Sequence, residues 1–261
     1  MDYVTLGKQC IAAALKKLSE IREIIITEDT LNVQTNADLE SNKAILDCIK
    51  KSGLTCNVFS EEEKDMLKIN GGNDDVIIML DPIDNTHLYL RGEISFCSVA
   101  LMIIIKGTPK YAFVSDITTN DIYYCDENKS YKNDEVITVP QKVPGRNIIL
   151  GYAPYKMRME RLVSSLIDLT EEEYYLYNFG GQLQTVKIAT GNYDAYVEIR
   201  AETLNEFCGA VIVQRAGGIV TTIQGKNVDY SPNKKQTLLV ARNKKIHTDI
   251  LNLLKDKEYE N

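Results

Sequence analysis

Histidine and closely spaced cysteine are scarce in this sequence, and their scarcity excludes several kinds of active site. Only two histidines occur, His87 and His247, and they lie far apart along the chain. This argues against zinc sites built on histidine pairs and against Ser-His or Cys-His nucleophile systems. The six cysteines include no Cys-x-x-Cys pair, which argues against a zinc ribbon or a thioredoxin-type site. Any catalysis is expected to use carboxylates and a metal ion.

Long apolar runs and an excess of basic residues are also missing. The longest apolar runs, such as residues 99–105, are far shorter than the roughly 20 residues of a membrane span. The N-terminus has no basic region followed by an apolar stretch, so we expect a cytoplasmic protein with reduced thiols and no membrane partner. Acids outnumber bases 37 to 30, which gives a net charge of −7 and indicates no nucleic-acid partner.

The length of 261 residues and the hydrophobic fraction of 44% suit one large domain or two closely packed lobes. A segment with two prolines and a glycine, residues 133–146, is the predicted boundary. We therefore expect an N-terminal α+β lobe over residues 1–135, with an antiparallel sheet and the metal-binding motifs. A C-terminal α/β lobe would follow over residues 136–261.

Hydrophobic patterning predicts the elements of both lobes. In the first lobe the predicted helices are residues 11–25 and 38–51, and the predicted strands of an antiparallel meander are 76–80, 95–105, 111–114 and 121–124. After the boundary, strands at 148–151, 195–199, 219–222 and 237–241 alternate with helices at 155–169, 182–190, 206–215 and 244–255. Alternation of this kind is typical of a sheet covered by helices.

A hexapeptide with the sequence DPIDNT, residues 81–86, directly follows the first strand of the meander. Side chains at the end of a strand lie at the edge of a sheet, which is a common place for a site. A turn at Pro82 would bring the carboxylates of Asp81 and Asp84 together, and these repel each other unless they share a proton or bind a cation. Hard oxygen ligands suit Mg²⁺, with Mn²⁺ or Ca²⁺ as alternatives. The plain alternative is an Asp-Pro turn with Thr86 as a helix cap.

Two further polar segments precede this hexapeptide, and each has a plain interpretation by itself. Residues 60–63, Ser-Glu-Glu-Glu, indicate the solvated start of a helix with Ser60 as its N-cap. Residues 32–38 indicate a loop that ends in a helix-capping Asp38. Their order along the chain, rather than either segment alone, suggests a site.

Taken in order, these segments resemble the signature motifs of the inositol monophosphatase superfamily, whose members are Mg²⁺-dependent phosphatases. The matching stretches are residues 33–38 (VQTNAD), 60–62 (SEE), 81–86 (DPIDNT), 179–183 (FGGQL), 189–198 (ATGNYDAYVE), and 204–209 (LNEFCG) running into 215–218 (RAGG). The resemblance covers nearly the whole chain, and the hexapeptide is fairly specific by itself.

The resemblance implies a site for two or more Mg²⁺ ions, with Mn²⁺ as an alternative metal. Glu61, Asp81 and the carbonyl oxygen of Ile83 would hold the first ion. Asp81 would bridge to a second ion, which Asp84 would also hold. Two metals bridged by a carboxylate form the clamp that phosphoryl transfer commonly uses.

The resemblance also implies the residues that act on the substrate. Thr86 and Asp38 would polarise the attacking water, and Glu61 is counted with them among the catalytic residues. The backbone N–H groups of Asn85 and Thr86 would cradle the phosphate. Glu198 matches a position that contacts substrate hydroxyl groups in family members. Asn85 stands where the family has glycine, and asparagine is among the residues that best tolerate a positive φ.

Asn205 is the most serious departure from the family pattern. The family carries aspartate here as a ligand of the second metal, and the spacing to Ala216-Gly217-Gly218 places Asn205 at that position. An amide oxygen can ligate Mg²⁺ without charge, so we expect weaker binding of the second ion and count Asn205 with the metal and substrate ligands. The plain alternative is that Asn205 only caps the following helix.

The expected fold is a layered αβαβα sandwich of the sugar-phosphatase type, with two sheets and the site between the lobes. The expected function is Mg²⁺-dependent hydrolysis of a small polyol or sugar phosphate, with inositol 1-phosphate first. Fructose 1,6-bisphosphate, the substrate of archaeal-type members, is an alternative. A catalytically impaired member that acts as a binding or interaction protein is another. Family members are commonly homodimers, so the resemblance implies a homodimer.

Overall fold

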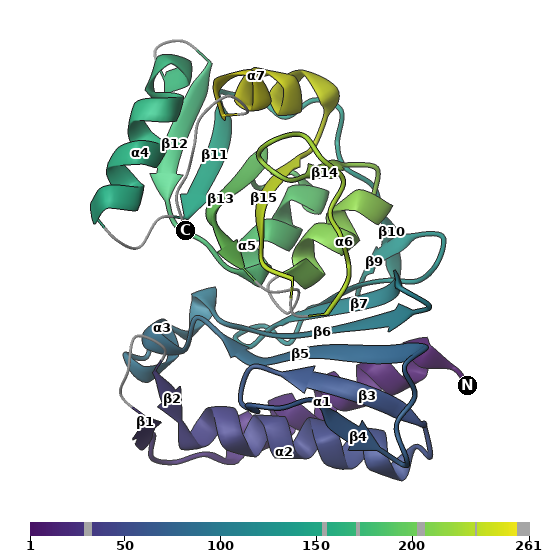
Figure 1. Ribbon diagram of the computed structural model, residues 1–261. Coiled ribbons are helices and arrows are strands. Elements are labelled where there is room, and N and C mark those ends of the chain that lie inside the picture. The colour runs from purple at the N-terminus through teal and green to yellow at the C-terminus, as the bar shows by residue number, and fades with distance from the viewer. Residues whose placement is uncertain (29–32, 153–155, 171–172, 203–206, 233, 255–261) are drawn as a thin grey trace.

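The computed structural model describes residues 1–28, 33–152, 156–170, 173–202, 207–232 and 234–254. The helices in these ranges include none with both the length and the apolar composition that crossing a membrane requires. The described elements stack in alternating layers of helices and sheets (Figure 1). In order, the layers are α1 (Tyr3–Glu20) with α2 (Asn36–Lys51), a first sheet, α5 (Gln182–Val186) with α6 (Cys208–Arg215), a second sheet, and α4 (Lys156–Leu166) with α7 (Lys244–Leu254). The fold is thus the layered sandwich with two sheets expected from the sequence.

The first sheet carries the hexapeptide. Its described strands are β3 (Cys56–Ser60), β4 (Leu67–Ile69), β5 (Val76–Asp84), β6 (Ser98–Ile105), β7 (Thr108–Asp116), β8 (Ile122–Cys125), β9 (Ser130–Lys132) and β10 (Glu135–Ile137), in the spatial order β10-β9-β8-β7-β6-β5-β3-β4. β5 to β8 form the predicted antiparallel meander, which β9 and β10 continue, whereas β3 pairs with β5 in parallel. β5 therefore has a neighbouring strand on both sides, and all of its side chains except that of Ile77 are buried.

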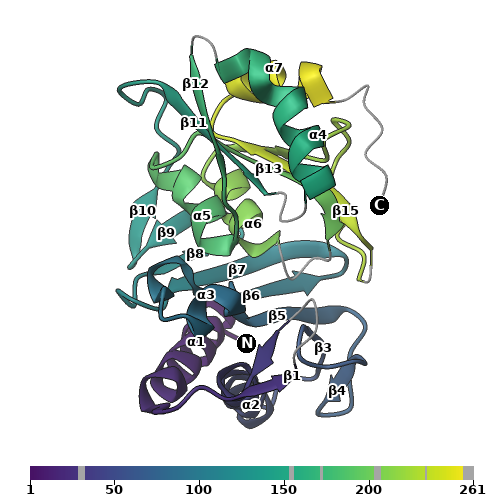
Figure 2. The same ribbon diagram turned by 90° about the vertical axis from the view of Figure 1, so that its left-hand side faces the viewer.

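The second sheet belongs to the C-terminal half of the chain. Its described strands are β11 (Asn147–Tyr152), β12 (Tyr174–Asn178), β13 (Ala195–Glu202), β14 (Ile219–Thr221) and β15 (Gln236–Ala241), in the order β12-β11-β13-β15-β14. β12, β11 and β13 run parallel, and β15 is antiparallel to both of its neighbours. Figure 2 shows α5 and α6 between the two sheets and α4 and α7 on the outer face of the second sheet.

Apolar side chains fill the spaces between the layers. Representative buried residues are Ile11, Ile45 and Phe113 beneath the first sheet, Met102, Leu183 and Phe207 between the sheets, and Ile149, Leu239 and Ile250 beneath the outer helices. Burial of apolar area stabilises a fold by about 25 cal/mol per Å², so these contacts set the spacing of the layers. Both sheets are thereby held close to α5 and α6.

The first helix ends earlier than its apolar pattern predicts. Ile21 has extended backbone angles, φ −71° and ψ 126°, so the last helical residue is Glu20. Ile25 is 54% exposed, and Ile26 begins the short strand β1 (Ile26–Glu28), which pairs with β2 (Gln34–Thr35). The apolar character of these isoleucines therefore does not mark a buried helix face.

Several short elements are not predicted by the patterning. They are β1 to β4, β9, β10, β12, the 3₁₀ helix η1 (Ile94–Phe96) and α3 (Thr86–Leu90), while the ends of two predicted helices form the 3₁₀ helices η2 (Ile167–Thr170) and η3 (Lys187–Thr190). Each has too few residues for a clear period, and pairing with a neighbour decides its conformation. Residues 95–97 accordingly do not belong to a strand, and residues 187–190 form a separate 3₁₀ turn after α5.

The stretch of chain that connects the first sheet to the second, between β10 and β11, is anchored by one buried arginine. Arg242 donates from Nη1 to the carbonyl oxygens of Pro140 and Gln141, at 3.2 and 2.8 Å. Its Nε forms an ion pair with Asp194, and both side chains are almost completely buried. These contacts tie the connection to the second sheet. The division into lobes at residues 135 and 136 stays a prediction.

Candidate active site

The two aspartates of the hexapeptide are buried at the end of β5. Asp81 is 1% exposed and Asp84 is 6% exposed. The pairing of β5 with β6 shifts between them, because Asp81 lies opposite Ala100 and Asp84 lies opposite Ser98. The chain therefore bulges at Pro82 rather than turning there as predicted, and it stays extended until Asp84. Buried carboxylates are costly unless hydrogen bonds or a cation offset the loss of water.

The parallel pairing of β3 with β5 places Glu61 at the same edge of the sheet. Ser60 lies opposite Leu80, and the N–H of Glu61 donates to the carbonyl oxygen of Leu80 at 3.1 Å. Ser60 thus ends a strand and does not begin a helix, which corrects the plain interpretation of that segment. The Glu61 side chain is exposed, whereas the partly buried Glu62 has its pKa raised to about 7, first by burial and then by the nearby charge of Asp38.

Asp84 is held by residues from both sheets. Its Oδ2 accepts a hydrogen bond from Ser98 Oγ at 3.0 Å and from the N–H of Gln182 at 2.8 Å. Gly181 has a φ of +126°, and a side chain there would meet Asp84 Oδ2 at 2.7 Å. Glycine is therefore needed for the loop before α5 to approach the carboxylate. Through this loop the C-terminal half of the chain reaches the hexapeptide.

Asn85 adopts the left-handed conformation that its position requires, with φ +67° and ψ +45°. Its Nδ2 donates to the carbonyl oxygens of Phe96 and Gly180, both at 3.1 Å. One side chain therefore joins the start of α3, the turn η1 and the loop before α5. The N–H groups of Asn85 and Thr86 precede the first hydrogen bond of α3, which the N–H of Leu88 donates to Asn85 O at 2.9 Å.

Asp38 and Thr86 are in direct contact. Thr86 Oγ1 lies 3.1 Å from Asp38 Oδ1 and 2.9 Å from the carbonyl oxygen of Ile83. Asp38 Oδ2 accepts from the N–H and the hydroxyl of Thr35, at 2.7 and 2.6 Å. Burial raises the pKa of the Asp38 carboxyl, while the hydrogen bonds from Thr35 and Thr86 act in the opposite direction.

The capping role predicted for Asp38 is also present, in a modified form. The helix begins at Asn36 with Thr35 as its N-cap, and Asp38 is the third helical residue of a capping box. Ser41 on the same helix donates to the carbonyl oxygen of Pro82 at 2.9 Å. The start of α2 is therefore fastened to the hexapeptide at two points, Thr86 and Pro82.

The remaining predicted residues lie on the second sheet or beyond the described part. Glu198 is buried on β13, opposite Tyr152 of β11, and its Oε2 accepts from Tyr196 OH at 3.2 Å. Tyr152 packs against Gly180, whose carbonyl oxygen binds Asn85. Glu198 is thereby one strand away from the loop that reaches the hexapeptide. Asn205 lies outside the described residues.

The donor set suits a hard divalent cation by its chemistry. Asp81, Asp84, Glu61 and the Ile83 carbonyl supply only oxygen, which Mg²⁺ prefers. Within the described ranges, however, no three or more His, Cys, Asp or Glu side chains are gathered closely enough to hold one metal ion. The predicted convergence of Glu61, Asp81 and Asp84 on one ion therefore stays a prediction.

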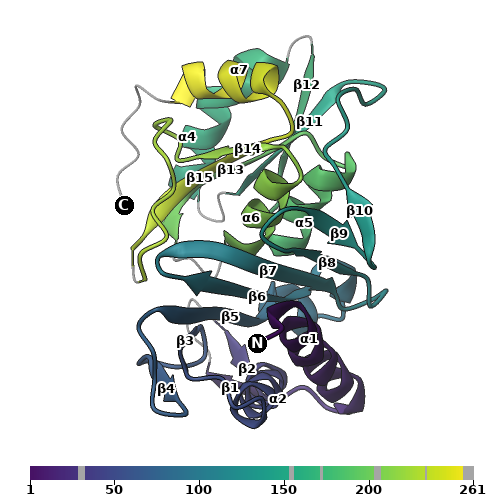
Figure 3. The same cartoon turned by 90° about the vertical axis from the view of Figure 1, so that its right-hand side faces the viewer.

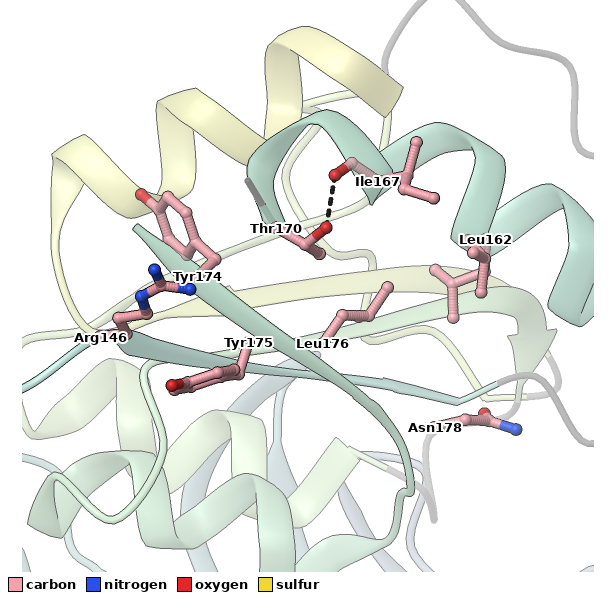
Figure 4. Close-up of a pocket in the computed structure, with 9 residues that line it drawn as sticks. Arg146, Leu162, Ile167, Thr170, Tyr174, Tyr175, Leu176 and Asn178 are labelled. Carbon is pink, nitrogen blue, oxygen red and sulfur yellow. Dashed lines mark hydrogen bonds between the residues drawn. The ribbon is translucent and has the colours of Figure 1, made fainter. Parts of the chain in front are cut away.

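A separate pocket opens on the C-terminal half, between α4 and β12, with a volume of about 430 Å³. Figure 4 shows it lined by apolar and aromatic side chains, among them Leu162, Ile167 and Tyr174, with Arg146 at one end. Thr170 on its wall donates to the carbonyl oxygen of Ile167 at 2.7 Å. None of the predicted site residues within the described part lines this pocket.

Ser98 and Gln182 are contacts of Asp84 that sequence reasoning did not single out. Ser98 is a polar residue at the start of an otherwise apolar strand, which is the signal that could have found it. Gln182 lies in the FGGQL stretch, but it reaches Asp84 through its backbone N–H, which any residue except proline could supply. Only the tertiary structure reveals that contact.

Comparison with known proteins agrees with the layered fold. The chain matches the inositol monophosphatase family over residues 3–259. It is 29% identical over 232 residues to a fructose-1,6-bisphosphatase/inositol-1-monophosphatase of Archaeoglobus fulgidus, covering 84% of this chain and 82% of that one. It is 26% identical over 204 residues to the Nus factor SuhB of Pasteurella multocida, covering 76% and 74%. The fold is similar to that of the extragenic suppressor protein suhB of Bartonella henselae, with a TM-score of 0.84, 19% identity, and coverage of 98% and 99%.

The family match over residues 3–259 defines the class of this protein as a phosphatase. The chain belongs to the inositol monophosphatase family, which is generally metal-dependent and acts on phosphorylated sugars and polyols.

Proposed function

We propose that this protein is a Mg²⁺-dependent phosphomonoesterase that hydrolyses a small polyol phosphate, with inositol 1-phosphate as the first substrate to test. The observation that carries this proposal is the contact between Thr86 Oγ1 and Asp38 Oδ1 beside the buried Asp81 and Asp84. A hydroxyl held by a carboxylate is suited to orient a water molecule and accept its proton.

Glu61, Asp81, Asp84 and the Ile83 carbonyl would hold the metal, with Asn205 as the uncharged ligand of a second ion. Mn²⁺ is the alternative metal. When bound, the cation would lower the pKa of a water molecule and neutralise charge on the phosphate oxygens. It would also reverse the local negative charge of the aspartates, which otherwise repel an anionic substrate.

Thr86 and Asp38 would activate the attacking water. A threonine hydroxyl carries one hydrogen, so Oγ1 donates to Asp38 or to the Ile83 carbonyl oxygen at any one time. When it donates to Asp38, its lone pairs are free to accept a hydrogen bond from water. Asp38 itself is kept in place by Thr35. The proton of the water would pass through Thr86 toward Asp38.

The substrate would lie between the start of α3 and the second sheet. The N–H groups of Asn85 and Thr86 would donate to phosphate oxygens, because they precede the first helical hydrogen bond. Glu198, on β13, would accept hydrogen bonds from substrate hydroxyl groups. A polyol or a sugar supplies both the phosphate and the hydroxyls that this arrangement would recognise.

Fructose 1,6-bisphosphate is the second substrate to test. The relative from Archaeoglobus fulgidus is named for hydrolysis of both this sugar phosphate and inositol 1-phosphate. A direct comparison of the two substrates decides between them.

A role without catalysis is the second candidate function. It is favoured by Asn205 at a position that is predicted to hold a metal, and by the relative named Nus factor SuhB. If this candidate holds, the carboxylates would keep a structural role and the protein would act through binding. The homodimer and the cytoplasmic location expected from the sequence stay predictions.

Phosphate release tests the leading proposal. The purified protein is assayed with inositol 1-phosphate and fructose 1,6-bisphosphate over a range of Mg²⁺ and Mn²⁺ concentrations. Asp81→Asn should reduce kcat at least about 100-fold, because it removes the charge of the bridging ligand. Asp75→Asn is the matched control, since Asp75 is exposed just before the other end of β5. Absence of release at every metal concentration would contradict the enzyme and favour the binding role.

Asn205→Asp tests the assignment of the second metal position. Adding a charged oxygen there should lower the Mg²⁺ concentration needed for half-maximal activity, because a carboxylate binds the ion more tightly than an amide. An unchanged metal requirement would indicate that Asn205 only caps a helix.

A further inference from the structure

A second group of reactive side chains lies between α1 and α2, on the face of the first sheet opposite to α5 and α6. A groove of about 680 Å³ runs between these two helices, which lie side by side beneath the sheet (Figure 3). Cys48 of α2 lines the groove and is half-buried, next to Ala44 of its own helix and Ala13 of α1. A thiol in this position is accessible to a small molecule in solution.

A second thiol lies beside Cys48 and is closed to solvent. Cys10 of α1 is completely buried in the apolar core beneath the first sheet, and Cys48 packs against that same core, so the two thiols are neighbours. The two cysteines come from different helices, so a bond between them would cross-link α1 to α2. Cys56 is also near, but the described residues contain no cluster of three such groups that could hold a metal ion. The chemistry open to this pair is therefore that of thiols.

The surroundings favour the thiolate at Cys48 and disfavour it at Cys10. The neighbouring Cys10 thiol lowers the pKa of Cys48, burial opposes this, and the positive charge of Lys51 lowers it further. The pKa of Cys10 is raised in turn by the neighbouring Cys48 thiol and by burial. The thiolate is the nucleophilic form, so Cys48 is the member of the pair that reacts first.

Three fully buried cysteines differ from the half-buried Cys48 in the pKa of the thiol. Burial raises the pKa of Cys56 to about 11 and those of Cys97 and Cys125 to about 12. These three thiols are protonated at neutral pH and are closed to solvent. They serve as internal references for reactivity.

We propose that Cys48 and Cys10 form an oxidant-responsive pair, in which Cys48 is the reacting thiol at the floor of the groove and Cys10 is the resolving thiol. The oxidant is a peroxide such as hydrogen peroxide. The Cys48 thiolate attacks one peroxide oxygen, an S–O bond forms and the O–O bond breaks. Hydroxide leaves and takes up the proton that the thiol released on ionisation, so that it departs as water. The sulfur is oxidised to sulfenic acid and the peroxide is reduced.

The second step closes the disulfide. The Cys10 sulfur attacks the Cys48 sulfur, an S–S bond forms, the S–O bond breaks, and water leaves with the proton of Cys10. Cys48 lies ten residues beyond Asp38 on α2, which is about 15 Å along the helix axis. The pair is therefore separate from the candidate active site, and its chemistry does not depend on the proposed phosphatase activity.

Mass spectrometry of the full chain tests this proposal. The reduced protein is treated with hydrogen peroxide, alkylated and digested, with and without dimedone to trap sulfenic acid. We expect a peptide pair linked through Cys10 and Cys48. Cys48→Ser should abolish the link, and Cys10→Ser should leave a sulfenic acid at Cys48 that dimedone traps. Cys10→Ala replaces Cys10→Ser if circular dichroism shows that the serine variant is unfolded.

The rate of oxidation supplies an independent measurement. Cys48 should react about tenfold faster than Cys56, because thiolate fraction and access both favour it. Lys51→Gln should slow the reaction of Cys48 by about threefold. Lys50→Gln, a change at the exposed neighbouring lysine, should leave the rate unchanged. A different disulfide, or a Cys48 that reacts no faster than Cys56, would overturn the proposal.

Discussion

Thr86 has one hydroxyl hydrogen and two acceptors within reach, and this competition is the central feature of the site at the scale of the residue. Asp38 Oδ1 lies at 3.1 Å and the Ile83 carbonyl oxygen at 2.9 Å. Donation to Asp38 keeps the carboxylate oriented and leaves Thr86 able to accept from water. The proposed chemistry therefore depends on the hydroxyl itself more than on the volume of the side chain.

Thr86→Val should reduce kcat by about 100- to 1,000-fold, because it removes the hydroxyl but keeps the shape. Thr86→Ser should retain most of the activity. The double variant Thr86→Val/Asp38→Asn should be no worse than the more damaging single variant, since the two residues act as a unit. Steady-state kinetics measures all three variants. Additive losses in the double variant would contradict a shared role.

Asn85 has a left-handed backbone conformation, and its side chain links three segments. Two different substitutions at this position can therefore separate the effect of backbone strain from that of the lost hydrogen bonds. Asn85→Gly keeps the conformation and loses two hydrogen bonds, each worth about 1 kcal/mol. Asn85→Ala loses the same bonds and adds about 1 kcal/mol of strain at positive φ. The alanine variant should therefore have the lower free energy of unfolding in urea titrations. Equal stability of the two variants would argue against strain at this position.

At the scale of the element, the close approach of the loop before α5 to β5 brings the two halves of the chain together. The loop supplies the N–H of Gln182 to Asp84 and the carbonyl oxygen of Gly180 to Asn85. The approach is possible because Gly181 has no side chain at a position facing both residues. The packing of short elements against each other thus completes the surroundings of the aspartates.

Gly181→Ala should displace this loop. Its Cβ would lie 2.3 Å from Asn85 Nδ2 and 2.7 Å from Asp84 Oδ2, which is closer than real side chains approach. We expect at least a tenfold loss of kcat together with a loss of stability. Gly71→Ala is the control, since Gly71 also has a positive φ, +101°, but no atom within 4 Å of the added group. The control should lose only about 1 to 2 kcal/mol to strain and keep its activity.

At the scale of the whole molecule, the buried face of α7 adds a polar contact to the apolar core. His247 on α7 is buried against the second sheet, and its Nε2 lies 2.8 Å from Thr221 Oγ1 of β14. Burial disfavours the charged imidazole and lowers the pKa of His247 from its ordinary value of 6.5. The folded protein therefore keeps this histidine neutral over a range of pH in which the unfolded chain protonates it.

Acidification should weaken the fold through His247. Between its lowered folded pKa and 6.5 the unfolded state binds more protons, so the free energy of unfolding rises with pH in that window. The stabilisation is complete above 6.5 and is lost as the pH falls toward the folded pKa. Urea unfolding at pH 5 to 8 should show a shallower pH dependence for His247→Gln than for the unaltered protein. The exposed His87→Gln serves as control, and the same pH dependence in all three proteins would refute this assignment.

The outline of the fold and part of the site can be predicted from the sequence. The helical spacing of apolar residues in α2 and the continuous apolar stretch in β5 each reflect burial of a single element. Both patterns can therefore be read from residues that are close together in the sequence. The DPIDNT hexapeptide identifies Asp81 and Asp84 because both residues lie within one short motif and can be recognised from their immediate neighbours in the sequence. Glu61 could be named only by resemblance, since its place beside Leu80 depends on the parallel pairing of two strands.

What the sequence by itself determined is the type of each long element, the oxygen-rich chemistry of the hexapeptide and the family. The tertiary structure alone decided which distant groups meet: Thr86 with Asp38, Gln182 with Asp84, and Cys10 with Cys48. The physical reason is that periodicity and composition act within one element, whereas these contacts arise when separate layers pack. Loop closure and packing bring these residues together, and nothing in the sequence around each one indicates which residue it will contact.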